Sequence, residues 1–303
     1  MPKIKLPYQQ KDALADMLSL KDKFVWLHTK TRSDHEFDLL VFEPEWCVSQ
    51  CSGKEIEDIK KLVSNFPMSD KQSSGFFNGG LVGYIGYSFS REQFHNKPSR
   101  RKAEAKFRLP PDLYIGYYPT NYFVIDHSTK TITGNVAEPA LFSAYRWVES
   151  PDLQILNNKD SEFRLTSGFS QSWSRQTYKA AYEKIKNYLL QGDCYQVNLA
   201  QLLTAEYLGN PFSVFKKVIA LHKTPNFAYV KTGSGAVLSF SPENFLSIEN
   251  NYICTKPIKG TRQRQADPAE DRVIAESLLA SSKDRAENVM IVDLLRNDLG
   301  RIA

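Results

Sequence analysis

The chain has 303 residues, of which 42% are hydrophobic and 12% aromatic, enough for one large domain or two ordinary ones. Its formal net charge is +5, and the densest basic run, Arg100 to Lys102, has no recognition helix or aromatic platform beside it, so we expect no nucleic-acid interface. No apolar run approaches the ~20 residues of a membrane span and no secretory signal is present, so we expect a cytoplasmic protein without a membrane contact.

The four cysteines have no metal-ligand spacing. Cys47 and Cys51 form a lone CxxxC motif, while Cys194 and Cys254 stand singly in apolar surroundings. This pattern indicates reduced thiols rather than a zinc site or disulfides.

The first half of the chain is predicted to be β-rich. Strands are expected from Phe24 to His28 and from Phe37 to Phe42. The glycine-rich segment Gly79 to Tyr87 has neither the Lys-Ser/Thr of a phosphate loop nor the spacing of a dinucleotide fingerprint, so it is interpreted as a tightly packed strand. Further strands are predicted from Tyr114 to Tyr118 and from Tyr122 to Asp126.

The second half begins after a polar connection that runs from about residue 149 to 174. Helical spacing of apolar residues predicts a helix with Ser174 as N-cap and Gly192 as its stop. A long strand is expected from Tyr195 to Leu208, and a second helix from Asn210-Pro211 to His222.

Four strands are then predicted, near residues 226–231, 236–240, 244–249 and 251–255, and the chain is expected to be helical from Pro268 onward. In the last helix the apolar residues Val289, Val292, Leu295 and Leu299 are expected to face the core.

The order of β-rich blocks wrapped by helices favours the α+β class over a regularly alternating parallel sheet. We expect a β-rich N-terminal subdomain over residues 1–165 and the first part of a catalytic region over residues 170–303. The sequence stops directly after an amphipathic helix and has no tail-like composition, which is typical of a truncated chain.

Two short motifs contain residues suited to catalysis. Lys259 lies in Pro257-Ile258-Lys259-Gly260-Thr261 after a predicted strand, and Glu243 lies sixteen positions earlier in Ser241-Pro242-Glu243. A desolvated lysine is a usable amine nucleophile, and a partly buried carboxyl can donate a proton to a leaving hydroxyl. The alternatives are a surface lysine in a turn and a glutamate that only caps the next turn.

These motifs, together with Gly192-Asp193-Cys194-Tyr195-Gln196 and the following Val197 to Gln201, resemble the chorismate-binding enzymes. The resemblance covers nearly the whole chain, weakly before residue 75 and strongly from 174 to 302. Lys259 resembles the aminodeoxychorismate synthase component I branch, since the anthranilate synthases usually carry alanine there. The implied fold is a sandwich of β-sheets surrounded by helices, incomplete at the C-terminus.

The resemblance implies that Lys259 attacks carbon 2 of chorismate while Glu243 protonates the departing 4-hydroxyl. Gln196, Gly260 and Thr261 would then bind substrate. Isochorismate and salicylate synthases have a water-activating lysine in place of Gln196, and an amide cannot act as that base. Gln196 could alternatively be a strand residue that only bonds its neighbours.

The resemblance also implies a Mg²⁺ ion held by Glu287, with a second glutamate ligand beyond Ala303. The family's tryptophan pocket matches Thr29, Asp34, His35, Glu36, Phe37, Pro225, Asn226 and Phe227. Thr29 replaces the more usual serine, and Thr29 and Phe37 could simply pack the first sheet.

The function implied by the resemblance is amination of chorismate to 4-amino-4-deoxychorismate, the precursor of 4-aminobenzoate and folate. The sequence has no Cys-His glutaminase motif, so a separate glutamine amidotransferase subunit (component II) is expected to supply ammonia, and a lyase to release pyruvate. The alternatives are anthranilate synthase component I, and a non-catalytic fragment that binds tryptophan or a partner subunit.

Overall fold

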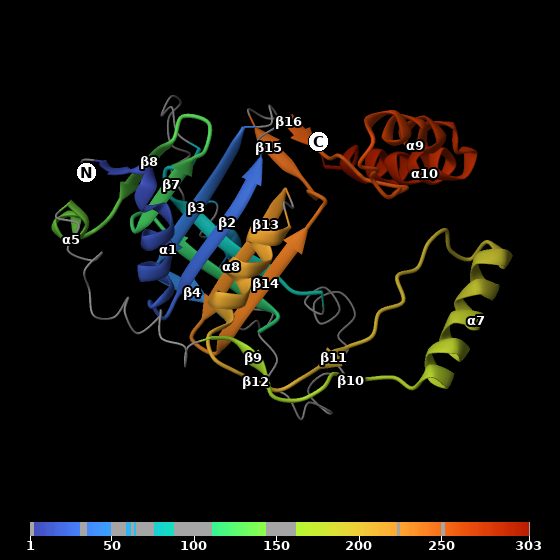
Figure 1. The fold of residues 1–303 in the computed structure, drawn as a ribbon, viewed down its shortest axis with the longest axis horizontal. Coiled ribbons are helices and arrows are strands. Elements are labelled where there is room, and N and C mark those ends of the chain that lie inside the picture. The colour runs from blue at the N-terminus through green and yellow to red at the C-terminus, as the bar shows by residue number, and fades with distance from the viewer. Residues whose placement is uncertain are drawn as a thin grey trace. The chain divides into compact units, whose positions relative to one another are not determined.

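The computed structural model describes residues 3–30, 35–49, 59–61, 64, 76–87, 111–143, 162–222, 225–249 and 252–302 (Figure 1). The chain forms two compact units. Unit 1 comprises residues 1–150 and 219–303, and unit 2 comprises residues 151–218. The sequence-based division between residues 165 and 170 stays a prediction.

The centre of unit 1 is a seven-stranded antiparallel sheet that combines strands from distant parts of the sequence (Figure 1). In spatial order its strands are β1 (Ile4–Pro7), β8 (Thr131–Asn135), β7 (Tyr122–Asp126), β3 (Glu36–Phe42), β2 (Phe24–Lys30), β13 (Asn226–Thr232) and β14 (Gly235–Ser241). The last five residues of β3 are all buried, as expected for a central strand covered on both faces. The predicted strands of this region are confirmed.

A second sheet covers one face of the large sheet. It contains β4 (Trp46–Val48), β6 (Leu113–Tyr118) and β5 (Gly80–Ile85) in that spatial order. Val82, Tyr114 and Tyr118 pack with Val25 and Val41 of the large sheet into one buried cluster. The two sheets therefore form the sandwich that the sequence predicted.

The glycine-rich segment lies within this second sheet, as a strand. A side-chain carbon placed on Gly83 would collide with the backbone carbonyl of Tyr114 on the neighbouring strand. The absence of a side chain therefore permits close packing, which confirms the interpretation as a packed strand.

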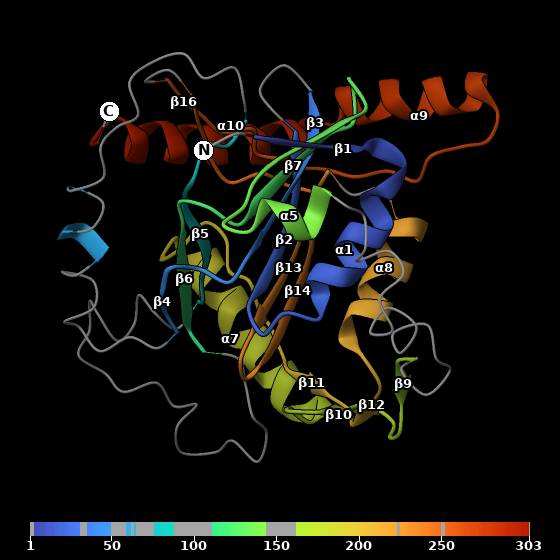
Figure 2. The same cartoon turned by 90° about the vertical axis from the view of Figure 1, so that its left-hand side faces the viewer.

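Helices cover the opposite face of the large sheet (Figure 2). The 3-10 turn η1 (Tyr8–Gln10) leads into α1 (Lys11–Ser19), which buries Leu14 and Leu18. Phe142 of α5 (Pro139–Ser143) contacts the rings of Phe42 and Phe123. Even-numbered residues of β2 and β3 therefore point toward the helices, and odd-numbered residues point into the sandwich.

The rest of unit 1 contains a hairpin and two helices. The hairpin pairs β15 (Ser247–Glu249) with β16 (Tyr252–Cys254). Helix α9 (Pro268–Ala280) begins at the N-cap Asp267, whose carboxylate accepts a hydrogen bond from the Ala269 N–H. Helix α10 (Ser282–Leu299) follows it directly. Ser281 interrupts the predicted helical stretch because its extended backbone and its hydroxyl cap the new helix.

The predicted burial of the last helix is wrong for the structure described here. No residue of α10 is buried, and the side chain of Val289 is 68% exposed. An apolar stripe is buried only where a second layer covers it, and none of the described elements covers this one.

Unit 2 contains helix α7 (Arg175–Gln191) and two pairs of two-residue strands. The predicted N-cap and stop of α7 are confirmed, since Ser174 accepts from the Thr177 N–H and Gly192 has a left-handed φ of 78°. Strand β9 (Arg164–Leu165) pairs with β12 (Tyr207–Leu208), and β10 (Ser170–Gln171) pairs with β11 (Leu203–Thr204). Helix α8 (Pro211–Leu221) begins here and ends in unit 1.

The predicted long strand from Tyr195 to Leu208 is therefore wrong. Only β11 and β12 form within it, and the side chain of Tyr195 is 80% exposed. A β-rich composition forms a strand when a neighbouring sheet buries it, and the described part of unit 2 provides no such sheet.

Candidate active site

Glu243 follows the end of β14 in a turn held by Ser241. The Ser241 hydroxyl donates a hydrogen bond to the Glu243 carbonyl oxygen at 2.8 Å and accepts one from the Glu243 N–H at 3.2 Å. Both bonds fix the backbone of a half-buried glutamate. The backbone of Glu243 is therefore fixed at the edge of the large sheet, directly after the edge strand β14.

The Glu243 carboxylate contacts the lysine motif. Its Oε1 atom accepts a hydrogen bond from the backbone N–H of Ile258 at 3.0 Å. Ile258 directly precedes Lys259, which is half-buried and lies on a segment without helix or strand. The structure thus brings the two sequence motifs together, through a contact between the Glu243 carboxylate and the backbone of the residue before Lys259.

Gly260 shapes the backbone on the other side of Lys259. Its φ of +74° is a left-handed conformation that side chains disfavour, and a side-chain carbon there would lie 3.0 Å from the Cβ and Cγ atoms of Asp284. Glycine is needed at this position both for the backbone angle and for the close approach of α10.

Two arginine–aspartate pairs hold the segment that follows Lys259. The Arg262 guanidinium donates to Asp284 at 2.7 Å and to the Thr261 carbonyl oxygen at 2.8 Å, and Arg264 binds Asp271 at 2.7 to 2.9 Å. The hydrogen bond from Ser281 and then the Arg262 guanidinium hold the pKa of Asp284 below its ordinary value. The segment is thereby attached to the first turns of both α9 and α10.

Sequence reasoning missed these two pairs. Their signal is the alternation of Arg262 and Arg264 directly before two helices that carry acidic residues in their first turns. Thr261, which the sequence placed in the substrate site, is exposed on this segment.

Gln196 lies in unit 2, exposed on a stretch without regular structure between α7 and β11. Its place in the substrate site stays a prediction.

Glu287 is half-buried on α10, three residues after Asp284. Among the described residues it belongs to no group of three possible metal ligands. Mg²⁺ prefers an octahedral set of oxygens, so Glu287 and its described neighbours do not by themselves complete such a site.

Most of the predicted tryptophan pocket gathers where β2 ends and β3 and β13 begin. The Thr29 hydroxyl donates to the Asn226 side-chain oxygen at 3.2 Å, and Pro225 directly precedes β13. Asp34 lies outside the described residues.

The register divides this set between the two faces of the sheet. Thr29 pairs with Phe37, and both face the sandwich interior, whereas Phe227 pairs with His28 on the helix-covered face. Glu36 also lies on that second face.

Phe76 contributes an aromatic contact that sequence reasoning missed. Its ring stacks on Phe37 with centroids 4.6 Å apart and lies 4.6 Å from the ring of His35. It comes from a segment distant in sequence and only the fold reveals the contact. Thr29 and Phe37 of the predicted set therefore face the sandwich interior, and the Phe76 ring stacks on Phe37.

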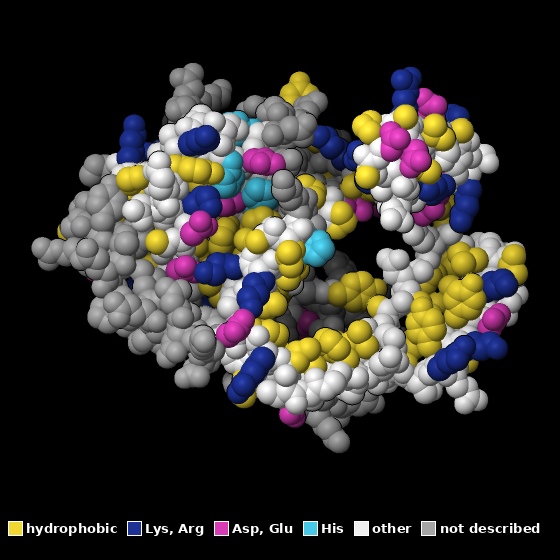
Figure 3. Space-filling view, viewed as in Figure 1, with side chains coloured by type: hydrophobic (Ala, Val, Ile, Leu, Met, Phe, Trp, Pro, Cys, Tyr) yellow, Lys and Arg dark blue, Asp and Glu magenta, His cyan; other side chains and the backbone are white. Residues whose placement is uncertain are grey.

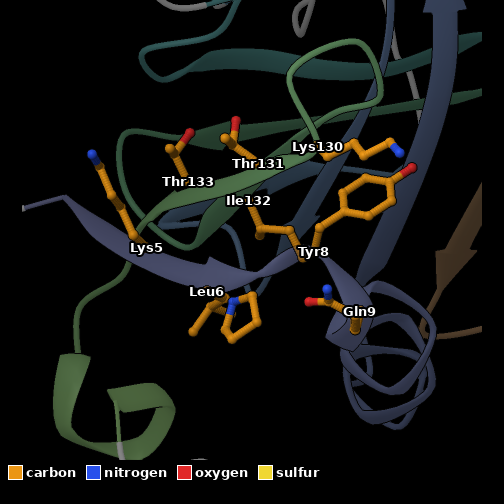
Figure 4. A pocket seen from close by; sticks show the side chains of 9 residues that line it. Lys5, Leu6, Tyr8, Gln9, Lys130, Thr131, Ile132 and Thr133 are labelled. Carbon is orange, nitrogen blue, oxygen red and sulfur yellow. The ribbon is translucent and has the colours of Figure 1, made fainter.

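A cavity of about 440 Å³ lies at the opposite edge of the large sheet, between β1 and β8 (Figure 4). Lys5, Tyr8, Lys130 and Ile132 are among its lining residues. None of the sequence-predicted site residues lines it.

Comparisons with known proteins show the family of the chain. The family model for chorismate binding enzymes matches residues 22–303. The chain belongs to this family. Its α+β sandwich is also similar to the solved structure of anthranilate synthase component I from Streptococcus pneumoniae TIGR4, with a TM-score of 0.67 over 88% of this chain and 62% of that chain. The sequence identity to that structure is 23%, so the likeness shows the fold.

Curated relatives lie in two branches of the family. Aminodeoxychorismate synthase component 1 of Klebsiella aerogenes is 39% identical over 233 residues, and that of Escherichia coli K12 is 37% identical over 227 residues. Both alignments cover 75% of this chain and 48% of the relative. Anthranilate synthase component 1 of Acetivibrio thermocellus is 31% identical over 277 residues, which are 84% of this chain and 54% of that protein. The chain thus spans about half the length of the curated relatives it matches.

None of the helices in the described residues combines the length and the apolar character that crossing a membrane requires.

Proposed function

We propose that this chain is part of an aminodeoxychorismate synthase component 1, which acts in the cytoplasm and converts chorismate and ammonia to 4-amino-4-deoxychorismate. The observation that carries the proposal is the hydrogen bond from the Ile258 N–H to the Glu243 carboxylate, which joins the glutamate motif to the residue directly before the half-buried Lys259. Identities of 37 to 39% to enzymes of that name support the branch.

In the proposed reaction the neutral amine of Lys259 forms a bond to carbon 2 of chorismate. The amine gives up one proton, both conjugated ring double bonds shift by one position, and the bond from carbon 4 to its hydroxyl oxygen breaks while Glu243 supplies the proton with which the hydroxyl leaves as water. Ammonia then forms a bond to carbon 4 and gives up one proton, both double bonds shift back, and the bond between carbon 2 and the Lys259 nitrogen breaks as that nitrogen takes up a proton. Lysine is regenerated, and the net change replaces a hydroxyl by an amine.

Substrate binding is assigned to the backbone around Gly260 and Thr261 and to Gln196. Mg²⁺ would supply a positive charge for a substrate carboxylate, and Glu287 would contribute one of its oxygen ligands. Ammonia would come from component II, the glutamine amidotransferase subunit, and a lyase would then release 4-aminobenzoate for folate synthesis. Bound tryptophan between the two sheets, near Thr29 and Phe37, is part of the same proposal.

Anthranilate synthase is the second candidate, because relatives of that name align with 84 to 87% of the chain. Lysine at position 259 argues against it, since that branch usually carries alanine there.

The product of chorismate and ammonia tests the proposal. The enzyme, given Mg²⁺ and excess ammonium, should produce 4-aminobenzoate only when a 4-amino-4-deoxychorismate lyase is added. Fluorescent 2-aminobenzoate formed without the lyase would instead establish the second candidate. Absence of both products in a folded preparation would favour a chain that only binds a ligand or a partner subunit.

A further inference from the structure

Two histidines and an aspartate converge on the helix-covered face of the large sheet. Nδ1 of His28 lies 2.6 Å from Oδ1 of Asp38, and Nε2 of His127 lies 3.2 Å from the same oxygen. One possible ligand atom from each side chain lies within 4.8 Å of the other two. We propose that His28, Asp38 and His127 bind one divalent transition-metal ion of the Zn²⁺ type.

The sheet itself positions these three side chains. His28 on β2 is directly opposite Asp38 on β3, so both point to the same face. Asp38 is opposite Ile125 on β7, and His127 directly follows the end of β7, where its N–H donates to the Glu36 carbonyl oxygen of β3 at 3.2 Å and its ring lies 5.7 Å from that of His28. The hydrogen-bonded backbones of three neighbouring segments of the sheet thus hold the three side chains in place.

Burying the Asp38 carboxyl group costs free energy unless that group has hydrogen-bonding or charged partners. The Asp38 side chain is 5% exposed. Its Oδ1 atom lies against a nitrogen of each histidine, at 2.6 Å from His28 and 3.2 Å from His127. A cation held by these three groups would be a further partner for the buried carboxyl group.

His127 provides an independent indication. Its Nε2 atom is buried and makes no hydrogen bond of acceptable geometry within the described residues, although the Asp38 oxygen is near. A buried polar atom without a hydrogen bond is rare in a folded protein, and a bound ion is one of its ordinary explanations. The nitrogen lies 3.2 Å from the Asp38 oxygen that would share the ion with it.

The second nitrogen of His127 has the partner that metal binding requires. Nδ1 lies 2.8 Å from the hydroxyl of Tyr8, the first residue of η1. A histidine bound to metal through one nitrogen usually donates its other N–H to a neighbouring oxygen, which fixes the ring. Tyr8 can accept this bond, and its ring lies in the wall of the cavity in Figure 4.

The ligand set and the spacing indicate the type of ion. Two imidazoles and a carboxylate suit Zn²⁺ and its neighbours in the first transition row rather than Mg²⁺ or Ca²⁺. Tetrahedral Zn²⁺ with ligands at 2.0 to 2.1 Å separates adjacent ligand atoms by about 3.3 Å. The separation of 3.2 Å from His127 to Asp38 already fits, and the 2.6 Å from His28 must widen by about 0.7 Å.

The two histidine side chains are partly exposed. The side chains of His28 and His127 are 12% and 21% exposed, and Figure 3 shows histidines on this face of the molecule. The His28 ring also stacks on Phe227 of β13, with centroids 4.4 Å apart. A bound ion would connect β2, β3 and the turn after β7 directly, and β13 through this stacked ring.

Metal titration of the 303-residue chain tests the proposal. After removal of metal with a chelator, calorimetry with Zn²⁺ should show one equivalent bound at micromolar or tighter affinity. Co²⁺ should bind at the same place and produce the visible absorption of a low-symmetry site. His28→Gln and His127→Gln should each weaken Zn²⁺ binding at least ~10-fold, and Tyr8→Phe should weaken it less, since it removes only an outer-shell partner.

The matched control is His222→Gln, which removes an exposed imidazole outside the site and should leave the affinity unchanged. The variant His127→Cys distinguishes a loss of Zn²⁺ binding caused by the missing ligand from one caused by misfolding. Its thiolate can still ligate the ion, and the Co²⁺ complex should then gain a sulfur charge-transfer band. The proposal is overturned if the wild-type chain binds no Zn²⁺, or if His28→Gln and His127→Gln bind it as tightly as His222→Gln.

Discussion

The Glu243 carboxyl has two separable roles in this account, because it accepts a hydrogen bond from the Ile258 N–H and is proposed to protonate the leaving hydroxyl. Replacement by glutamine keeps a side-chain oxygen that can accept from the Ile258 N–H, but removes the acidic proton. Replacement by alanine removes both. Comparison of the two variants therefore distinguishes positioning of the lysine segment from proton donation.

The structure sets the expected magnitudes. A hydrogen bond to a charged group contributes about 1.5–3 kcal/mol when buried. Ile258 is exposed and Glu243 only half-buried, so the contribution should be at the lower end or below, about 1 kcal/mol. Glu243→Gln should therefore leave the free energy of unfolding within about 0.5 kcal/mol of wild type, and Glu243→Ala should lower it by about 1 kcal/mol.

Activity should respond differently from stability. Loss of a positioned proton donor costs ~10²–10⁴-fold, so both variants should lose at least ~100-fold in the lyase-coupled formation of 4-aminobenzoate. Urea denaturation monitored by circular dichroism measures the first effect, and the coupled assay with saturating ammonium measures the second. If Glu243→Gln keeps turnover near the wild-type rate, the carboxyl is not the proton donor and only its hydrogen bond matters.

Three further outcomes follow from the same structure. Gly260→Ala should lower the rate of amination, because the left-handed φ at this position costs about 1–3 kcal/mol for alanine and the new side-chain carbon would contact Asp284. Gly233→Ala is the control: it places the new carbon in open space and should leave the rate of amination unchanged. Burial raises the pKa of Tyr84 in the folded state to about 12, whereas its pKa in the unfolded chain is near 10. The free energy of unfolding should therefore be constant below pH 10 and decline as the pH rises from 10 to 12, because only the unfolded chain loses the proton there. The urea midpoint of the wild type should show this decline and that of Tyr84→Phe a weaker one; equal declines would refute the role of Tyr84. Chromatography of reaction products should show no isochorismate or salicylate, since Gln196 cannot act as a base, and either product at the amination rate would contradict that role.

Local signals predicted a substantial part of the fold. The cap and stop of α7 lie at Ser174 and Gly192 as predicted, because both depend on a few adjacent residues. The strands β2, β3, β7, β13 and β14 of the large sheet also follow from their composition, whereas β1 and β8 were not predicted. The long strand predicted from Tyr195 to Leu208 fails because strand formation depends on a neighbouring sheet, which no window of sequence contains.

The candidate site shows the same division. Glu243 and Lys259 were found as motifs, and the fold then supplied the contact between Glu243 and Ile258. The pair of Arg262 with Asp284 joins residues 22 positions apart, and the group of His28 and His127 depends on strand register over about 100 residues. Such contacts are set by tertiary structure, so the sequence alone did not reveal them.

The proposed nucleophile can be tested most directly by mass spectrometry of the enzyme after brief reaction with chorismate in the absence of ammonia. The account predicts that the peptide containing Lys259 gains the mass of chorismate less one water. Lys259→Ala should abolish this adduct and lower amination at least ~100-fold, while Lys256→Ala, an exposed neighbour, should keep both. Unmodified Lys259 in an enzyme that aminates chorismate at full rate, or unchanged turnover in Lys259→Ala, would contradict the central claim.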